Sequence, residues 1–96
     1  MKKFMLLHVG FEMPSPEIME KWQAWFQSVA DCTVENIGLG PAAKAINHEG
    51  SRDIPFDTQA ITGASIIHAE SMDAAEKIAQ ANPFITEIQI YEIREH

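Results

Sequence analysis

The chain has 96 residues, which is enough for one hydrophobic core, so we expect a single domain over residues 1–96. Hydrophobic residues make up 46% and charged residues 22%, a balance typical of soluble globular proteins that excludes disordered or collagen-like chains. Seven Lys and Arg stand against fourteen Asp and Glu, giving a net charge of −7. Seven basic side chains are too few for a surface that binds the phosphates of a nucleic acid, so we expect no nucleic-acid partner.

The single cysteine and the lack of long apolar runs indicate where in the cell the protein is expected. Cys32 has no second cysteine to pair with, as is common in the reducing cytosol. The apolar run after Lys3 ends by Phe11 without the small residues of a signal-peptide cleavage site. No run approaches the ~20 apolar residues that cross a bilayer. We therefore expect a cytoplasmic protein without a membrane partner.

The first half of the chain predicts a strand and then a helix. Residues Phe4–Val9 form a short apolar run that Gly10 closes, as in a buried strand. Ser15 followed by Pro16 is a helix start, because the serine oxygen can cap a free N–H and proline suits the first turn. The helix is expected to continue to about Ala30, with an apolar stripe made of Ile18, Trp22, Trp25, Phe26 and Val29.

The second half predicts two or three strands and a second helix. In chain order, the expected elements are a weak strand at Ala42–Asn47, a turn at His48–Ser51, an irregular segment at Arg52–Thr62, a strand at Ala64–Ala69, a helix capped by Ser71 and stopped at Asn82–Pro83, and a strand at Ile85–Ile93. With right-handed crossovers, this order predicts an α+β fold of ferredoxin-like βαββαβ type. It is an antiparallel sheet with both helices on one face.

The strands are apolar on both sides, which points to a partner. Neighbouring residues of a strand face opposite ways, so Leu6 and Leu7 lie on different faces, as do Ile66 and Ile67. Two helices on one side leave the other apolar face open, and a large open patch of this kind is normally an interface. We expect a homodimer in which two sheets pack face to face, with burial on the order of 2,000 Å².

Several short motifs resemble those of the YCII-related proteins, in the branch named for an Asp-Gly-Pro-Phe (DGPF) motif. In chain order they are Lys3-Phe4-Met5-Leu6-Leu7, Gly40-Pro41, Asp53-Ile54-Pro55-Phe56, Gly63 before an apolar strand, Asp73-Ala74-Ala75, and Asn82-Pro83-Phe84. The resemblance covers nearly the whole chain and implies a dimeric α+β barrel. The family is largely of unknown activity, although some relatives look like enzymes acting on small cyclic or chlorinated aromatic molecules.

The resemblance also implies a catalytic His–Asp dyad, which this chain does not keep. The family histidine lies early in the first helix, but no histidine occurs between Pro14 and Cys32. Asp53 matches the motif aspartate, whereas Asn82 occupies the place of the family's Asp-Pro aspartate. Any acid–base chemistry would therefore need other residues.

Two histidines and one aspartate are the candidate catalytic residues. His8 and His68 lie in expected strands, where an imidazole could act as a base or equally be satisfied by a backbone partner. Asp53 could supply a carboxylate or simply form a turn. The candidate substrate-binding residues are Trp22 on the first helix and Phe56 with Asp57 in the irregular segment.

The sequence contains no metal-binding or phosphate-binding motif. His-x-x-x-His, Cys-x-x-Cys and EF-hand patterns do not occur, so we expect no metal and no cofactor. The favoured function is binding of a small cyclic or aromatic molecule in a pocket of the homodimer, with acid–base catalysis as an extension. The alternative is a non-catalytic accessory or regulatory module that binds another protein.

Overall fold

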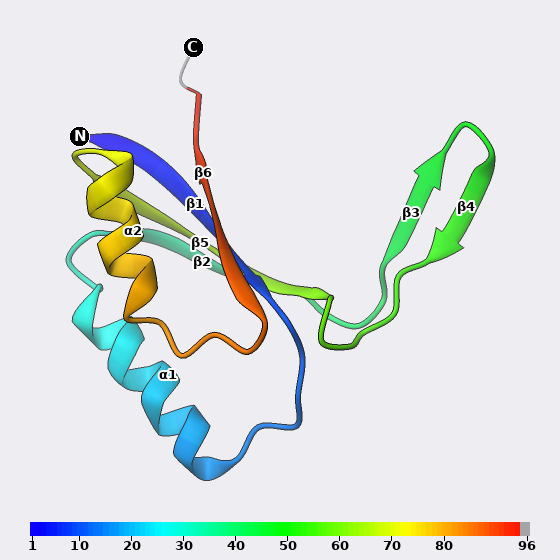
Figure 1. Cartoon of the computed structure of the whole chain (residues 1–96), viewed down its shortest axis with the longest axis horizontal. Helices are drawn as coiled ribbons and strands as arrows, with labels where there is room; N and C mark the ends of the chain where they lie inside the picture. The colour runs from blue at the N-terminus through cyan, green and yellow to red at the C-terminus, as the bar shows by residue number, and fades with distance from the viewer. Residues whose placement is uncertain (95–96) are drawn as a thin grey trace.

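A computed structural model describes residues 1–94 and shows a four-stranded antiparallel sheet (Figure 1). The sheet order is β2-β5-β1-β6, with β1 at Lys2–Val9, β2 at Thr33–Gly38, β5 at Ile61–Ala69 and β6 at Glu87–Glu92. Both neighbours of the central strand β1 run antiparallel to it. This order with a helix after β1 and another after β5 is the ferredoxin-like α+β topology, and the predicted fold class is confirmed.

Both helices begin at the serines that the sequence indicates. Helix α1 spans Pro16–Ser28, and the Ser15 side chain accepts a hydrogen bond from the backbone N–H of Ile18. Helix α2 spans Met72–Gln80, and the Ser71 side chain accepts one from Ala74. These bonds satisfy N–H groups that have no partner within the first helical turn.

The hydrophobic core lies between the two helices and one face of the sheet. Its buried members are Phe4, Leu6, Trp25, Val29, Ile67, Ala69, Ala75 and Ala79. The shortest dimension of the molecule is 18 Å, which accommodates one layer of helices on one sheet and no third layer.

The second strand of the sheet differs from the prediction. The segment Thr33–Gly38 pairs with β5, whereas Lys44–Asn47 forms strand β3 and pairs with β4 at Gly50–Asp53. The two-stranded hairpin β3–β4 extends away from the main sheet (Figure 1). Gly50, the first residue of β4 after the turn, has a φ of 137°, the positive φ for which the sequence analysis expected a glycine.

The face of the sheet opposite the helices combines apolar residues with Lys3, Glu35, His68 and Gln89, and no other element within residues 1–94 covers it. The register places Met5 opposite Ile66 and Tyr91, and Leu7 opposite Ala64, on this open face. Tyr91 remains 57% exposed. The term "open face" refers below to this side of the sheet.

Neither helix is both long and apolar enough to cross a lipid bilayer, as judged over residues 1–94.

Candidate functional site

A cavity of about 510 Å³ lies on the helix side of the sheet, where β1 ends. Its wall comes from the end of β1, the β1–α1 loop, the first turns of α1, and the segment between α2 and β6. The lining residues are His8, Val9, Gly10, Phe11, Glu12, Met13, Pro14, Ser15, Ile18, Trp22, Thr62, Pro83, Phe84 and Ile85. The volume falls within the ~300–1,000 Å³ that small-molecule sites occupy.

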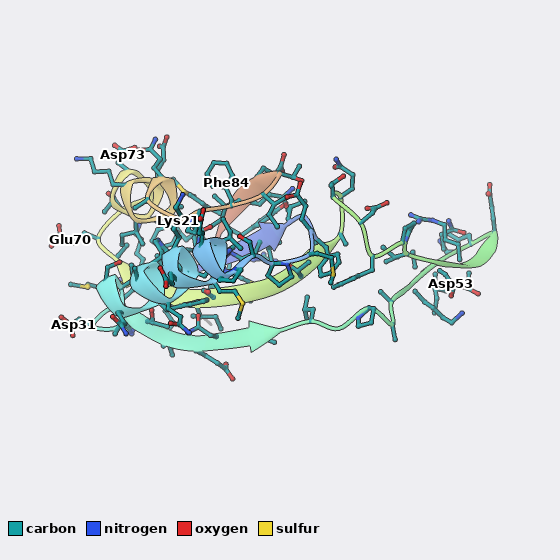
Figure 2. The ribbon with its side chains drawn as sticks, turned by 90° about the horizontal axis from the view of Figure 1, so that it is seen from below. Lys21, Asp31, Asp53, Glu70, Asp73 and Phe84 are labelled. Carbon is teal, nitrogen blue, oxygen red and sulfur yellow. The ribbon has the colours of Figure 1, made fainter. Side chains whose placement is uncertain are left out.

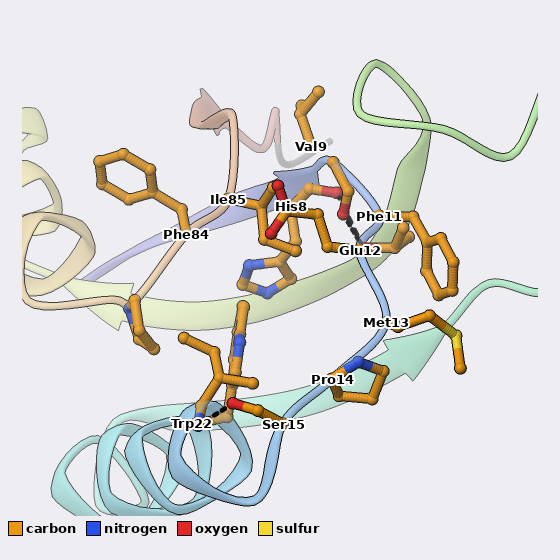
Figure 3. Close-up of a pocket in the computed structure, with 14 residues that line it drawn as sticks. His8, Val9, Phe11, Glu12, Met13, Pro14, Ser15, Trp22, Phe84 and Ile85 are labelled. Carbon is orange, nitrogen blue, oxygen red and sulfur yellow. Dashed lines mark hydrogen bonds between the residues drawn. The ribbon is translucent and has the colours of Figure 1, made fainter.

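Aromatic side chains surround an imidazole in this cavity. Figure 3 shows the His8 ring between Trp22, on α1, and the segment that carries Phe84 and Ile85. The Trp22 ring meets the His8 ring edge-on, with centroids 5.2 Å apart. Phe11 lies on the opposite rim (Figure 3). A flat apolar molecule would therefore find ring surfaces on several sides.

Position 10, where the chain leaves β1 and enters the cavity wall, accommodates only glycine. Its φ is 118°, and a Cβ at this position would lie 2.7 Å from Thr86 Oγ1 and 3.0 Å from Ile85. The Gly10 N–H donates to the carbonyl oxygen of Ala60 at 2.7 Å. A residue with a side chain would therefore push the Ile85–Thr86 segment away from β1 and deform the cavity.

His8 is held by a chain of two side-chain hydrogen bonds. Its Nε2 lies 2.9 Å from Ser65 Oγ on β5, and Ser65 Oγ donates to Asn36 Oδ1 on β2 at 2.7 Å. The strand residue paired with His8 is Gly63. A Cβ at this position would lie 2.9 Å from the Ile37 carbonyl oxygen, which is too close, and 3.6 Å from His8 Cδ2, which is an ordinary contact. The three strands β1, β5 and β2 thus fix the ring from one side.

Burial makes the His8 side chain an uncharged imidazole at neutral pH. The residue is only 7% exposed, and this desolvation lowers its pKa from 6.5 to about 4. The second ring nitrogen, Nδ1, is also buried and has no hydrogen-bond partner among the described residues. His8 therefore presents a free polar atom within the cavity wall.

Asp53 and His68 lie away from this cavity. Asp53 is at the end of β4 on the hairpin, far from both helices (Figure 2), and its carboxylate pairs with Lys44 Nζ at 2.8 Å. His68 is on β5 opposite Lys3, and because it neighbours the core residue Ile67 it faces the open side of the sheet. His8 and His68 are therefore on opposite faces, and a joint catalytic role for the three residues stays a prediction.

Two further sequence candidates border the cavity from outside. The Phe56 ring packs against the lining residue Phe11, with centroids 4.2 Å apart and the rings tilted by 38°. Asp57 accepts the Phe11 N–H at its carbonyl oxygen, while its carboxylate accepts the N–H of Gln59. Phe56 and Asp57 therefore support the β1–α1 loop, and their direct contact with a substrate stays a prediction.

The sequence reasoning missed Ser65, Asn36 and Phe84. Ser65 is 1% exposed in an otherwise apolar strand, and a polar residue at such a position usually has a specific partner. That signal was present in the sequence, but Asn36 could not be paired with it because β2 was not predicted.

No group of three or more His, Cys, Asp or Glu side chains that could hold a metal ion occurs within residues 1–94.

The fold and cavity define a class of protein: a ferredoxin-like α+β chain with a cavity of small-molecule size at one end of its sheet. No family model matches the chain, and no curated protein matches its sequence. Among solved structures it is similar to 5-chloro-2-hydroxyhydroquinone dehydrochlorinase (TftG) from Burkholderia phenoliruptrix AC1100, in complex with 2,5-dihydroxybenzoquinone. The TM-score is 0.57 at 10% identity, over 98% of this chain and 95% of the other. This likeness shows that the two share a fold.

Proposed function

We propose that the protein binds a small cyclic or aromatic molecule in the cavity beside His8. The observation that carries this proposal is a pocket of about 510 Å³ with aromatic walls and one buried, unpartnered imidazole nitrogen. Such pockets typically combine apolar surface with a few polar atoms that fix the orientation of the ligand. The quinone-bound neighbour of the same fold and the resemblance to YCII-related proteins support this function.

Acid–base catalysis is the natural extension of this binding role. The imidazole of His8 is in its base form at neutral pH, and Glu12 lines the same cavity. A base with a pKa near 4 is fully available but weak, so it suits a substrate whose proton is already acidic. Such a reaction would therefore act on an activated C–H or O–H bond.

A calorimetric titration with hydroquinone tests the binding role. We expect saturable binding that weakens at least tenfold in Trp22→Leu, because that ring forms one wall of the cavity. Ile46→Thr is the matched control, since Ile46 is 82% exposed on the distant hairpin. The absence of binding up to millimolar concentration would refute the proposal. A stoichiometric protein partner recovered together with that negative result would favour the accessory-module alternative.

We further propose that the protein is a homodimer in which the open faces of two sheets pack together. The apolar residues Met5, Leu7 and Ile66 on this face support the proposal, because water-exposed patches of this kind are normally interfaces. Sedimentation equilibrium at micromolar concentration should give twice the mass of the chain. A stable monomer would contradict the dimer without affecting the binding proposal.

A further inference from the structure

The hydrogen-bond chain from His8 to Asn36 determines where the imidazole proton lies. A serine hydroxyl has one proton, and Ser65 donates it to Asn36 Oδ1. Ser65 Oγ can then only accept from His8, so the proton of the neutral imidazole must be on Nε2. It follows that His8 Nδ1 carries a lone pair and is a hydrogen-bond acceptor.

Among the residues that line the cavity, this acceptor is the buried side-chain polar atom without a hydrogen-bond partner within residues 1–94. A buried acceptor that receives no hydrogen bond costs free energy. A ligand that donates a hydrogen bond to His8 Nδ1 would remove this cost and therefore bind more tightly. Because Nδ1 is closed to bulk water, the donor must come from a molecule that displaces part of the wall.

The charges of the lining residues restrict the ligand further. Glu12 is the charged residue among them, and neither Lys nor Arg lines the cavity. A carboxylate or phosphate would lose its hydration without meeting a cation, and it would also face Glu12. The cavity therefore disfavours anions, whereas the rings of Phe11, Trp22 and Phe84 favour a flat uncharged molecule.

We propose that Ser65 and Asn36 are positioning residues that hold His8 as an acceptor for the hydroxyl of an uncharged aromatic or quinoid ring. The ligand class is thus hydroxylated neutral rings, and ring acids and fully etherified rings are excluded. This inference rests on the proposed small-molecule function, and it adds the chemical rule by which the cavity selects its ligand.

Binding measurements with three probe molecules distinguish this inference from the proposed binding function on which it rests. Hydroquinone, 1,4-dimethoxybenzene and benzoate share a flat ring but differ in hydrogen-bond donor and charge. We expect hydroquinone to bind about tenfold more tightly than the dimethyl ether, the effect of one hydrogen bond. Benzoate should bind more weakly still. If the ether or benzoate binds as well as hydroquinone, the inference fails while the binding function stands. If no probe binds, the function itself fails.

Two substitutions at Asn36 test the positioning role, and this residue is on the exposed edge strand, where a change leaves the core intact. In Asn36→Ala, Ser65 is free to donate its proton to His8 Nε2, so the imidazole proton should move to Nδ1. Asn36→Asp keeps an acceptor for Ser65 and should retain the original tautomer.

Long-range ¹H–¹⁵N spectra of the full chain report the tautomer directly, with His8 assigned by comparison with His8→Gln. We expect a protonated Nε2 in the natural chain and in Asn36→Asp, together with the preference for hydroquinone over its ether. Asn36→Ala should show a protonated Nδ1 and lose that preference. The same tautomer in all three proteins, or an unchanged preference in Asn36→Ala, would overturn the assignment.

Discussion

The buried imidazole of His8 should make the stability of the fold depend on pH in a defined window. Its pKa is about 4 in the folded chain and near 6.5 in the unfolded chain. Between these values the unfolded chain binds more protons than the folded chain, so stability rises with pH. The stability that depends on a neutral His8 is fully present above pH 6.5, and it is lost as the pH falls toward 4. The full effect is about 3 kcal/mol, at 1.36 kcal/mol for each pKa unit.

Urea unfolding, followed by circular dichroism at fixed protein concentration, measures this effect. Between pH 7 and pH 4.5, the two pKa values give a loss of about 2 kcal/mol from His8 alone. The change of pH acts on the whole chain, so the loss must be measured against a variant that lacks only the His8 imidazole. His8→Gln is suitable because glutamine has an N–H donor for Ser65 but does not titrate.

The decisive quantity is the difference between the two proteins. The natural chain should lose about 2 kcal/mol more than His8→Gln between pH 7 and pH 4.5. Equal losses would show that His8 is protonated as easily in the folded as in the unfolded chain. That result would refute both the burial of the ring and its neutral state in the cavity.

Three other experiments test separate parts of the structure. Gly10→Ala should lower the unfolding free energy by about 1–3 kcal/mol, because residue 10 has a positive φ and a Cβ there would meet Thr86. Gly40→Ala is the control: a Cβ at residue 40 would lie in open space, so the same urea titration should show little change. Leu7→Lys, on the open face, should convert the proposed dimer to monomers in sedimentation experiments with an unchanged circular dichroism spectrum. A double-mutant cycle on the Lys44–Asp53 pair should give a coupling below about 1 kcal/mol, because both side chains are mostly exposed; a larger value would mean that the hairpin is packed against something in solution.

The helices and three strands of the sheet could be predicted because their signals are local. The stripe from Ile18 to Val29 and the caps at Ser15 and Ser71 depend only on residues a few positions apart. Strand β2 could not be recognised in this way. It is an edge strand in which Val34 is 48% exposed, so apolar and polar residues do not alternate clearly along it.

The candidate site was only partly predictable, because its residues meet through strand register. His8 and Trp22 were identified as candidates by residue type and position, and both line the cavity. The link from His8 through Ser65 to Asn36 joins positions 57 and 29 residues apart, on three strands. No spacing rule brings such positions together until the order of the strands is known. The same applies to Asp53, whose place on a separate hairpin follows from the pairing of β3 with β4.

The hairpin β3–β4 has a practical consequence for anyone who handles this protein. Within residues 1–94 its strands pair with each other and share no ladder with the main sheet, so unzipping it leaves the core hydrogen bonds in place. The turn between Asn47 and Gly50 is thus a natural point for grafting an epitope, a fluorophore or a surface tether. A label there would report on the molecule from a distance, while the cavity at the end of β1 kept its shape.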